Sequence, residues 1–237
     1  MPHRHRHVLS GFTAALLTLS LLFTAGCETP NATLREQGYR ALMDGDIDRA
    51  DNRYSLAVKQ DPTDWKSQYH LGVVRLRQGR PAQAETHLEQ ALATHYNMPE
   101  TYYIHDALAK AYYQQHLTEK LYENLAQWAE GSGHTRDYLR QAKYLGMMGD
   151  VDGATIAYRK AQLFAERTDP EPFIAAADFY EKIGDINAAV VELRKAYFVA
   201  PENEEITTRL RRFGIIPGPT IAIEPEYQPI PKTTDAR

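Results

Sequence analysis

The sequence predicts an all-α solenoid, a stack of helix–turn–helix units, because glycines recur at a regular interval between helical segments. Gly45 and Gly79 are 34 residues apart, Gly149 and Gly184 are 35 apart, and the gap of 70 between the two pairs equals two such steps. Apolar residues on either side of these glycines recur at intervals of three and four, the period of an amphipathic helix. A helix–turn–helix pattern that repeats about every 34 residues is typical of stacked helical repeats. Such arrays form extended concave surfaces that are suited to binding.

The composition is that of an ordinary soluble protein and gives no sign of a nucleic-acid partner. Of the 237 residues, 43% are hydrophobic and 24% are charged, and the net charge is −4. These fractions are typical of globular domains. No long run of one charge sign occurs, so we expect no nucleic acid to bind. The single cysteine, Cys27, excludes a disulfide within the chain.

The first 26 residues have the organisation of a secretory signal peptide. Arg4 and Arg6 provide a basic start, residues 8–23 form an apolar run, and small residues stand directly before Cys27. The apolar run has 16 residues, fewer than the roughly 20 that span a bilayer as a helix. We therefore predict a secretory signal peptide over 1–26, and the residues around Cys27 indicate its type.

The segment around the cysteine resembles the lipobox of bacterial lipoproteins. Ala25 and Gly26 precede Cys27, although Thr24 stands where that family usually has leucine. The resemblance implies cleavage before Cys27 and a lipid on this residue; a plain cleaved signal and an uncleaved anchor are the alternatives. Glu28, rather than aspartate, follows the cysteine, which in similar lipoproteins favours the outer membrane, facing the periplasm. We accordingly expect a protein of the bacterial cell envelope that is held at the membrane by a lipid anchor at Cys27.

After a lipidated spacer over 27–30, helical patterning begins and the first two units have clear limits. In the unit 31–64, Pro62 ends the second helix, because a residue before proline disfavours the α conformation. In the unit 65–98, Pro81 follows the turn glycine and fits the first turn of a helix, where no N–H donor is needed.

The third unit, 99–133, is predicted to be irregular. It lacks a turn glycine, which the spacing would place near Gln114. Leu121 and Trp128 also stand where the second helices of the other units have small residues. We expect the two helices to splay here, or the array to bend.

Two further units and a capping helix complete the predicted array. The units cover 135–168 and 170–203, and an amphipathic helix over 204–213 is expected to cover the apolar face of the last unit, with polar residues outside. The tail 214–237 is predicted to be extended or disordered, and we interpret it as passive, with a peptide-ligand role as the alternative. It contains five prolines, at positions 217, 219, 225, 229 and 231.

The units resemble the tetratricopeptide repeat (TPR) family, whose pattern is a helix–turn–helix of 34 residues. Leu71 and Gly72 match the signature of its first helix, and Ala84, Leu88 and Ala91 match that of its second. Small residues allow two helices to cross closely, and large residues fill the space between them. The resemblance implies a TPR α-solenoid of about five helix–turn–helix units plus a C-terminal capping helix.

In TPR proteins the first helices of successive units line a concave groove, and here their exposed stripe is aromatic and basic. It turns acidic in the last unit, at Asp178 and Glu181. Aromatic residues and arginine are typical of binding hot spots, and a basic groove suits an extended segment of acidic or mixed character. The alternative is a solvated charged face with tyrosines packed against their neighbours. The predicted groove residues are Arg35, Tyr39, Tyr69, Arg77, Tyr103, Lys110, Tyr113, Arg136 and Lys143.

The sequence contains no motif for catalysis, a cofactor or a metal. HExxH, CxxC, GxSxG and a glycine-rich phosphate loop are all absent, and the histidines of the repeats are scattered. We therefore expect no enzyme activity, no cofactor and no metal. The aspartates that directly follow turn glycines, Asp46, Asp150 and Asp185, are expected to cap the next helix.

Together these features predict a non-catalytic scaffold or adaptor that binds protein or peptide segments in its concave groove. Similar lipidated TPR proteins have interaction roles, and we favour the assembly of an envelope, pilus or secretion complex. The alternative is a soluble periplasmic carrier of a small ligand or peptidoglycan fragment. A closed apolar pocket between the third and fourth units would favour the carrier, and an open groove would favour the scaffold.

Overall fold

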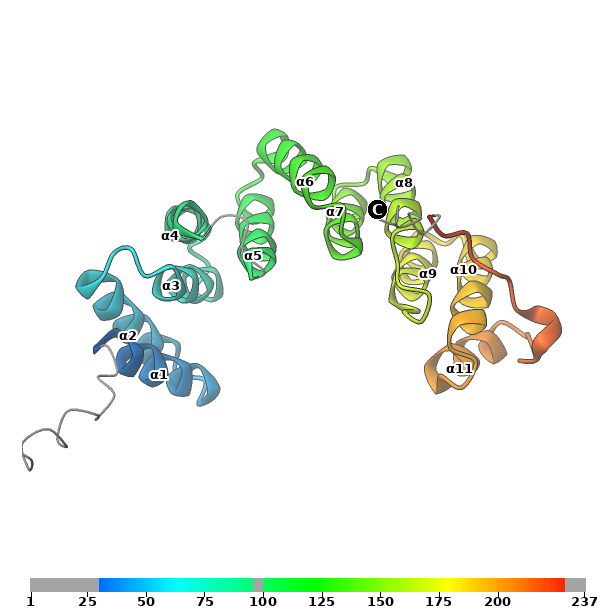
Figure 1. Cartoon of the computed structure of the whole chain (residues 1–237), viewed down its shortest axis with the longest axis horizontal. Helices are drawn as coiled ribbons and strands as arrows, with labels where there is room; N and C mark the ends of the chain where they lie inside the picture. Colours follow the sequence, from blue (N-terminus) through cyan, green and yellow to red (C-terminus); the bar gives the residue numbers. More distant parts are fainter. Residues whose placement is uncertain (1–29, 96–99, 229–237) are drawn as a thin grey trace, which may run out of the picture.

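A computed structural model describes residues 30–95 and 100–228, which form an arch of stacked helices (Figure 1). These residues contain eleven α-helices and one short 3-10 helix, η1, and none of them forms a strand, which confirms the predicted all-α fold. The elements are α1 (Pro30–Met43), α2 (Ile47–Gln60), α3 (Trp65–Arg77), α4 (Pro81–Thr94), α5 (Thr101–Gln114), α6 (Thr118–Ser132), α7 (Thr135–Met147), α8 (Val151–Leu163), α9 (Glu171–Ile183), α10 (Ile186–Val199), α11 (Glu204–Arg212) and η1 (Pro219–Ile221).

The helices pair in chain order into five units, and α11 closes the array as the predicted cap. Its apolar side is buried, because Ile206 and Leu210 join a core cluster with Phe173 of α9 and Leu193 of α10. Its outer side carries charge, including Arg211, which is exposed. A cap of this kind keeps the apolar end of a solenoid out of water.

In four of the five units, a turn glycine ends the first helix in a left-handed conformation. At Gly149, φ is +84°, a value that costs residues with a Cβ atom free energy. Its N–H donates to the carbonyl of Gly146 at 3.2 Å, and the N–H of Asp150 donates to the carbonyl of Leu145 at 3.0 Å. This pair of bonds is a Schellman motif, which satisfies the last carbonyls of the helix. The same motif occurs at Gly45, Gly79 and Gly184.

The aspartates after three of these glycines cap the following helix, as predicted. The Oδ1 atom of Asp46 accepts the N–H of Arg49 at 2.9 Å. Asp150 and Asp185 accept the N–H groups of Gly153 and Ala188 in the same way, at 2.9 and 3.0 Å. Each cap satisfies a backbone donor that has no partner within its helix and contributes about 1 kcal/mol.

The third unit keeps the same turn without a glycine. His116 has φ +56°, the one positive φ of a non-glycine residue among the described residues. Its N–H donates to the carbonyl of Tyr113 at 3.1 Å, and the N–H of Leu117 donates to that of Tyr112 at 3.0 Å. The turn therefore falls two residues after Gln114, where the glycine spacing placed it. A left-handed residue with a Cβ atom costs about 1–2 kcal/mol relative to the right-handed conformation.

Substituting glycine at this turn is expected to stabilise the protein. His116→Gly should raise the free energy of unfolding by about 1 kcal/mol, because relief of the left-handed strain exceeds the greater freedom of glycine in the unfolded chain. The reverse change, Gly149→Ala, serves as the control and should lower it by about 1 kcal/mol. Urea denaturation followed by circular dichroism measures both. A loss of stability in His116→Gly would show that the histidine side chain stabilises this turn.

Within the units, glycine allows the first helix to approach its partner closely. A Cβ atom on Gly72 would lie 2.6 Å from Cγ of Leu88, and one on Gly38 would lie 2.7 Å from Cζ of Tyr54. Both distances are shorter than a van der Waals contact. Leu88 and Tyr54 are fully buried by this packing. The large side chain of the second helix thus lies directly on the backbone of the first, as the resemblance implied.

The third unit is splayed, as its large residues predicted. Helices α5 and α6 contact each other less extensively than the two helices of any other unit do. Leu121, Leu125 and Trp128 of α6 are buried between them and hold them apart. The core of this unit is instead continuous with that of the second unit through Leu88 and Ile104. Figure 1 shows α6 at the top of the arch.

The chain after α11 folds back on the last units, a contact that its composition did not predict. Residues 214–228 are extended apart from η1, and they cross α10 to reach the end of α8 (Figure 1). Pro225 is buried there.

The predicted membrane anchor lies outside the part of the chain that the structure describes. Residues 1–29 contain the predicted signal peptide and Cys27, and the prediction for both stands untested. Among the described helices, none has the length and apolar character that crossing a membrane requires.

Candidate protein-binding groove

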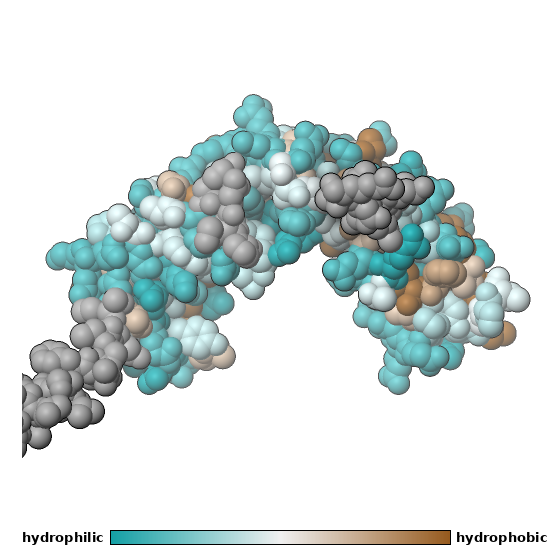
Figure 2. Space-filling view, viewed as in Figure 1, coloured by the Kyte–Doolittle hydropathy of each residue, from teal (hydrophilic) through white to brown (hydrophobic). Residues whose placement is uncertain are grey.

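A groove of about 740 Å³ lies between α5, α7 and α9, the first helices of the third, fourth and fifth units. The first helices form the inner side of the arch, which is hollowed in the space-filling view (Figure 2). The groove follows from the repeat, because each unit places its first helix on the same side as the one before. Its charged lining includes Lys110, Arg136, Arg140, Lys143, Glu171 and Asp178.

One wall of the groove carries exposed cations. Lys110 of α5 and Arg136 and Lys143 of α7 are exposed and line the groove. None of these three side chains forms a salt bridge within residues 30–95 and 100–228. The Arg136 guanidinium lies 4.2 Å from the centre of the Tyr102 ring, and Lys143 Nζ lies 5.7 Å from that of Tyr144. These rings stabilise the cations while leaving their N–H donors available to a ligand.

Beneath the cations, a buried arginine joins α5 to α7. The side chain of Arg140 is 3% exposed, and its Nε donates to Oδ1 of Asp106 on α5 at 2.5 Å. Its Nη1 donates to Oδ1 of Asp137 at 2.5 Å, and its Nη2 to the carbonyl of Tyr102 at 3.2 Å. All three contacts are fixed by α5 and α7, so Arg140 sets the spacing of the two helices that carry the exposed cations.

The opposite wall, on α9, is mainly acidic, although Lys182 of the same helix also lines it. Glu171 and Asp178 are exposed there, and Asp178 accepts a salt bridge from Arg209 of α11 at 2.6 Å. Partial burial raises the pKa of Glu171, and the neighbouring acids, Asp169 among them, raise it further. The groove therefore has a basic wall and an acidic wall, which would orient a bound segment that carries both charge signs.

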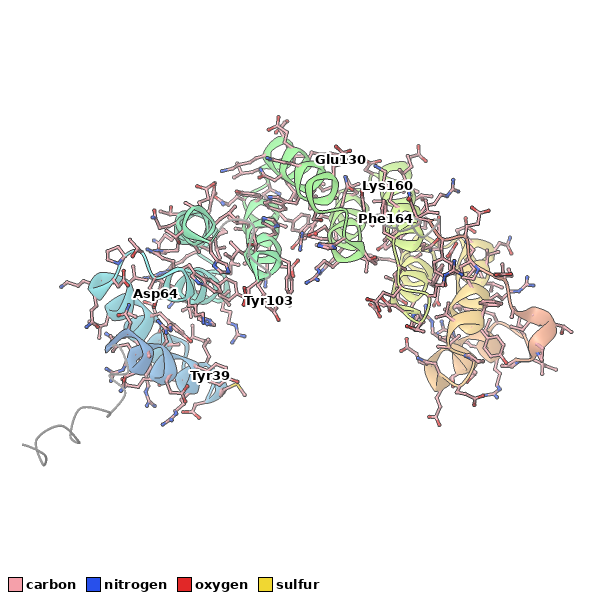
Figure 3. The ribbon with its side chains drawn as sticks, in the orientation of Figure 1. Tyr39, Asp64, Tyr103, Glu130, Lys160 and Phe164 are labelled. Atoms are coloured by element: carbon pink, nitrogen blue, oxygen red, sulfur yellow. The ribbon has the colours of Figure 1, made fainter. Side chains whose placement is uncertain are left out.

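Tyrosines continue the inner surface toward the N-terminal end of the arch. Tyr39 is 51% exposed and Tyr103 is 47% exposed, and both lie on the inner side (Figure 3). Tyr103 lies 3.9 Å from Tyr102 and 6.5 Å from Tyr69, measured between ring centres. Burial raises the pKa of Tyr69 further above neutrality, and its protonated hydroxyl can donate a hydrogen bond. Rigid aromatic rings of this kind offer contact area at low cost in side-chain entropy.

The structure brings three of the predicted groove residues into the cavity and gives two others a structural contact. Lys110, Arg136 and Lys143 line it together. Arg35 instead forms a salt bridge with Asp64, which caps α3.

Tyr113 is not among the residues that line this cavity. Its ring packs against Tyr144 at 5.8 Å and faces a separate cavity of about 260 Å³ beside α6. Arg77 is exposed at the end of α3.

Arg140 and Tyr102 were not among the predicted groove residues. Arg140 follows Arg136 at a spacing of four residues, which places both on one face of a helix and could have indicated it.

His105 of α5 packs against the core of the third unit. The ring of His105 stacks on Trp128, with 4.3 Å between the ring centres, and its Nε2 is buried without a hydrogen-bond partner. Burial lowers the pKa of His105 to about 4, and the nearby Arg140 contributes to the shift. Among the described residues, no group of three or more His, Cys, Asp or Glu side chains is placed to hold a metal ion.

Comparisons with known proteins agree on the fold. A tetratricopeptide repeat family model matches residues 41–111, which run from α1 into α5. A thermophilic TPR protein of Thermus thermophilus has 19% sequence identity and a TM-score of 0.54, with 77% of this chain and 97% of that chain covered. MamA has 22% identity and a TM-score of 0.53, with 74% and 96% covered. PilW, a type IV pilus biogenesis factor, has 16% identity and a TM-score of 0.59, with 76% and 83% covered. The curated proteins contain no match to this chain.

Proposed function

Because the chain folds as a TPR α-solenoid, we propose that it is a non-catalytic scaffold that binds extended protein segments in its concave groove. The proposal includes a lipid on Cys27 that holds the scaffold at the bacterial cell envelope. It acts there in the assembly of an envelope, pilus or secretion complex.

The observation that carries the proposal is the groove between α5, α7 and α9. It holds Lys110, Arg136 and Lys143 on one wall and Glu171 and Asp178 on the other. A segment with an acidic side chain facing α7 and a basic one facing α9 complements both walls. Charge pairs of this kind set the direction of a bound segment and speed its association.

The open side of the groove supports a scaffold over a carrier. A small-molecule carrier encloses most of its ligand in a concave and mainly apolar pocket. Here the lining combines apolar residues with charged ones, the groove is open on one side, and its cations are exposed to solvent. An extended segment can enter such a groove from the side and leave both its ends free.

The envelope location rests on the N-terminal sequence. The basic start, the apolar run of 8–23 and the small residues before Cys27 support export and lipidation. The fold of PilW, itself a pilus biogenesis factor, is consistent with an assembly role, although a likeness of 16% identity concerns the fold alone.

Reversing the charge of the basic wall is expected to weaken partner binding at least tenfold. In affinity capture from solubilised membranes, Lys110→Glu/Lys143→Glu should recover the partners of the wild-type protein at a level at least tenfold lower. Each reversal replaces an attraction with a repulsion at the groove. The matched control is Lys59→Glu/Arg211→Glu, which makes the same change in net charge at exposed sites on α2 and α11. Equal recovery by the groove variant and the control would rule out the groove as the binding site.

Lipidation is tested separately by metabolic labelling with a fatty acid. We expect label on the wild-type protein and none on Cys27→Ala, which should also leave the membrane fraction. An unlabelled wild-type protein, or label that survives the substitution, would contradict the anchor. The result is independent of the groove, because Cys27 lies outside the repeats.

A further inference from the structure

The C-terminal segment 219–228 lies across the last two units as a bound peptide would. Three hydrogen bonds to its main chain hold it there. The N–H of Ile223 donates to the carbonyl of Arg194 at 3.3 Å, and Nε of Arg194 donates to the carbonyl of Ile221 at 2.6 Å. The N–H of Gln228 donates to the carbonyl of Leu163 at 2.9 Å. The segment is thus recognised at both ends, by α10 and by the end of α8.

The side chains between these bonds give the contact its specificity. Pro225 is buried, and the ring of Tyr227 meets that of Phe173 edge-on, with 6.4 Å between the ring centres. The Arg167 guanidinium lies 5.1 Å from the centre of the Tyr227 ring. Tyr227 is therefore an aromatic anchor between an apolar ring and a cation, a favourable environment for tyrosine.

The charges of the segment also match the surface beneath it. Glu224 and Glu226 line a cavity of about 470 Å³ together with Arg159 of α8 and Lys195 of α10. Lys195 is paired with Glu192 at 2.8 Å, whereas Arg159 forms no salt bridge among the described residues. Arg159 is therefore the cation that remains available to the acidic side chains on either side of the buried proline. This face is formed mainly by the second helices, and Tyr158 lines both this cavity and the concave groove.

The fit of the segment is incomplete. The cavity beneath it contains space for several more side-chain atoms, and its lining is polar as well as apolar. The hydroxyl of Tyr227 is buried without a hydrogen-bond partner. A buried unpaired hydroxyl weakens binding. A partner segment that filled the cavity and paired the hydroxyl of its own tyrosine would therefore bind more tightly than the resident one.

We propose that the surface of α8, α9 and α10 is a second binding site, which takes extended acidic segments with a buried proline and a tyrosine anchor. The segment 219–228 of the chain itself occupies this site. A partner segment of the same chemistry binds only by displacing it, so the tail restricts access to the site. This proposal does not depend on binding in the concave groove.

A synthetic peptide with the sequence of residues 219–228 provides the probe. Its binding to the full chain is measured by fluorescence anisotropy, with the wild-type protein compared with Glu224→Lys/Tyr227→Ala, which releases the tail. The tethered tail competes at a high effective concentration in the wild type. We expect the released variant to bind the peptide at least tenfold more tightly, and Ile216→Ala, at a residue that is 85% exposed, to behave as the wild type does.

Two further measurements keep the test decisive. A peptide that lacks the tyrosine should bind to the released variant at least tenfold more weakly than the complete peptide does. The complete peptide should also bind at least tenfold more weakly once Arg167→Ala is added to the released variant. In the wild-type protein, excess peptide should speed hydrogen exchange at the amides of Ile223 and Gln228, a readout that needs no variant to fold. A folded released variant that fails to bind the peptide would overturn the proposal. Exchange rates at these two amides that excess peptide leaves unchanged would also overturn it.

Discussion

Replacing Arg140 with alanine is expected to lower the free energy of unfolding by about 3–5 kcal/mol, a large part of the stability of a domain. The side chains of Arg140 and Asp137 are only 3% and 5% exposed. Removal of the cation leaves the carboxylate of Asp137 buried, with the hydroxyl of Ser132 as its remaining side-chain partner in the network. It also releases Asp106 and thereby the contact between α5 and α7.

Urea denaturation followed by circular dichroism measures this effect, and Arg136→Ala is the matched control. Arg136 lies one turn earlier on α7 and is exposed. Its loss should cost less than about 1 kcal/mol, as is usual for charged groups at a protein surface. A loss of less than about 1 kcal/mol in Arg140→Ala would mean that water or a rearranged side chain satisfies Asp137. Binding in the groove should also fall in Arg140→Ala, because the spacing of α5 and α7 changes.

Acidification from about pH 6.5 to about pH 4 is expected to destabilise the protein through two half-buried histidines, His70 and His105. Burial lowers the pKa of His70 to about 4, with Arg35 as a further cause, and burial with Arg140 lowers that of His105 to about 4. The unfolded chain has histidines with a pKa near 6.5 and therefore binds these protons first. The stabilisation is fully present above about pH 6.5 and is lost as the pH falls toward about 4.

The expected loss is on the order of 2 kcal/mol for each histidine. A pKa shift of one unit corresponds to about 1.4 kcal/mol, and we reduce the full value because both rings are partly exposed. Urea denaturation at about pH 7.0, 5.5 and 4.5 measures the slope of the unfolding free energy against pH. His105→Phe keeps the stacking on Trp128 but cannot be protonated. It should therefore remove about half of the loss in unfolding free energy that the two histidines cause on acidification. Addition of His70→Gln should remove most of the remainder, and an identical slope in the wild type and the double variant would contradict this assignment.

The turns and caps of the repeat could be predicted because they depend on neighbouring residues. A glycine followed by aspartate determines both the left-handed turn and the cap, whatever the rest of the chain does. The third turn was harder to place, since His116 adopts the same conformation without the residue type that marks it. Leu121 and Trp128 nonetheless indicated the splayed unit, because side-chain volume limits how closely two helices approach.

The groove was only partly predictable, because salt bridges between neighbouring units decide which charged side chains remain unpaired. Exposure on the first helices suggested Lys110, Arg136 and Lys143, and the structure places these three residues along one cavity. It also suggested Arg35, which the structure pairs with Asp64, a residue 29 positions away. The buried arginine of the groove, Arg140, has a partner 34 positions away, Asp106. Partners at this distance in sequence become neighbours only when one unit packs on the next.

The sequence by itself determined the all-α solenoid, its helical pairs and its capping helix, because periodic apolar residues and local turn motifs specify them. Only the tertiary structure decided which cations remain free, how the groove is divided into a basic and an acidic wall, and where the tail binds. Free and paired cations have the same sequence pattern on a helix. They differ in the charges that the packing of a neighbouring unit, or of the returning tail, brings within a few ångströms.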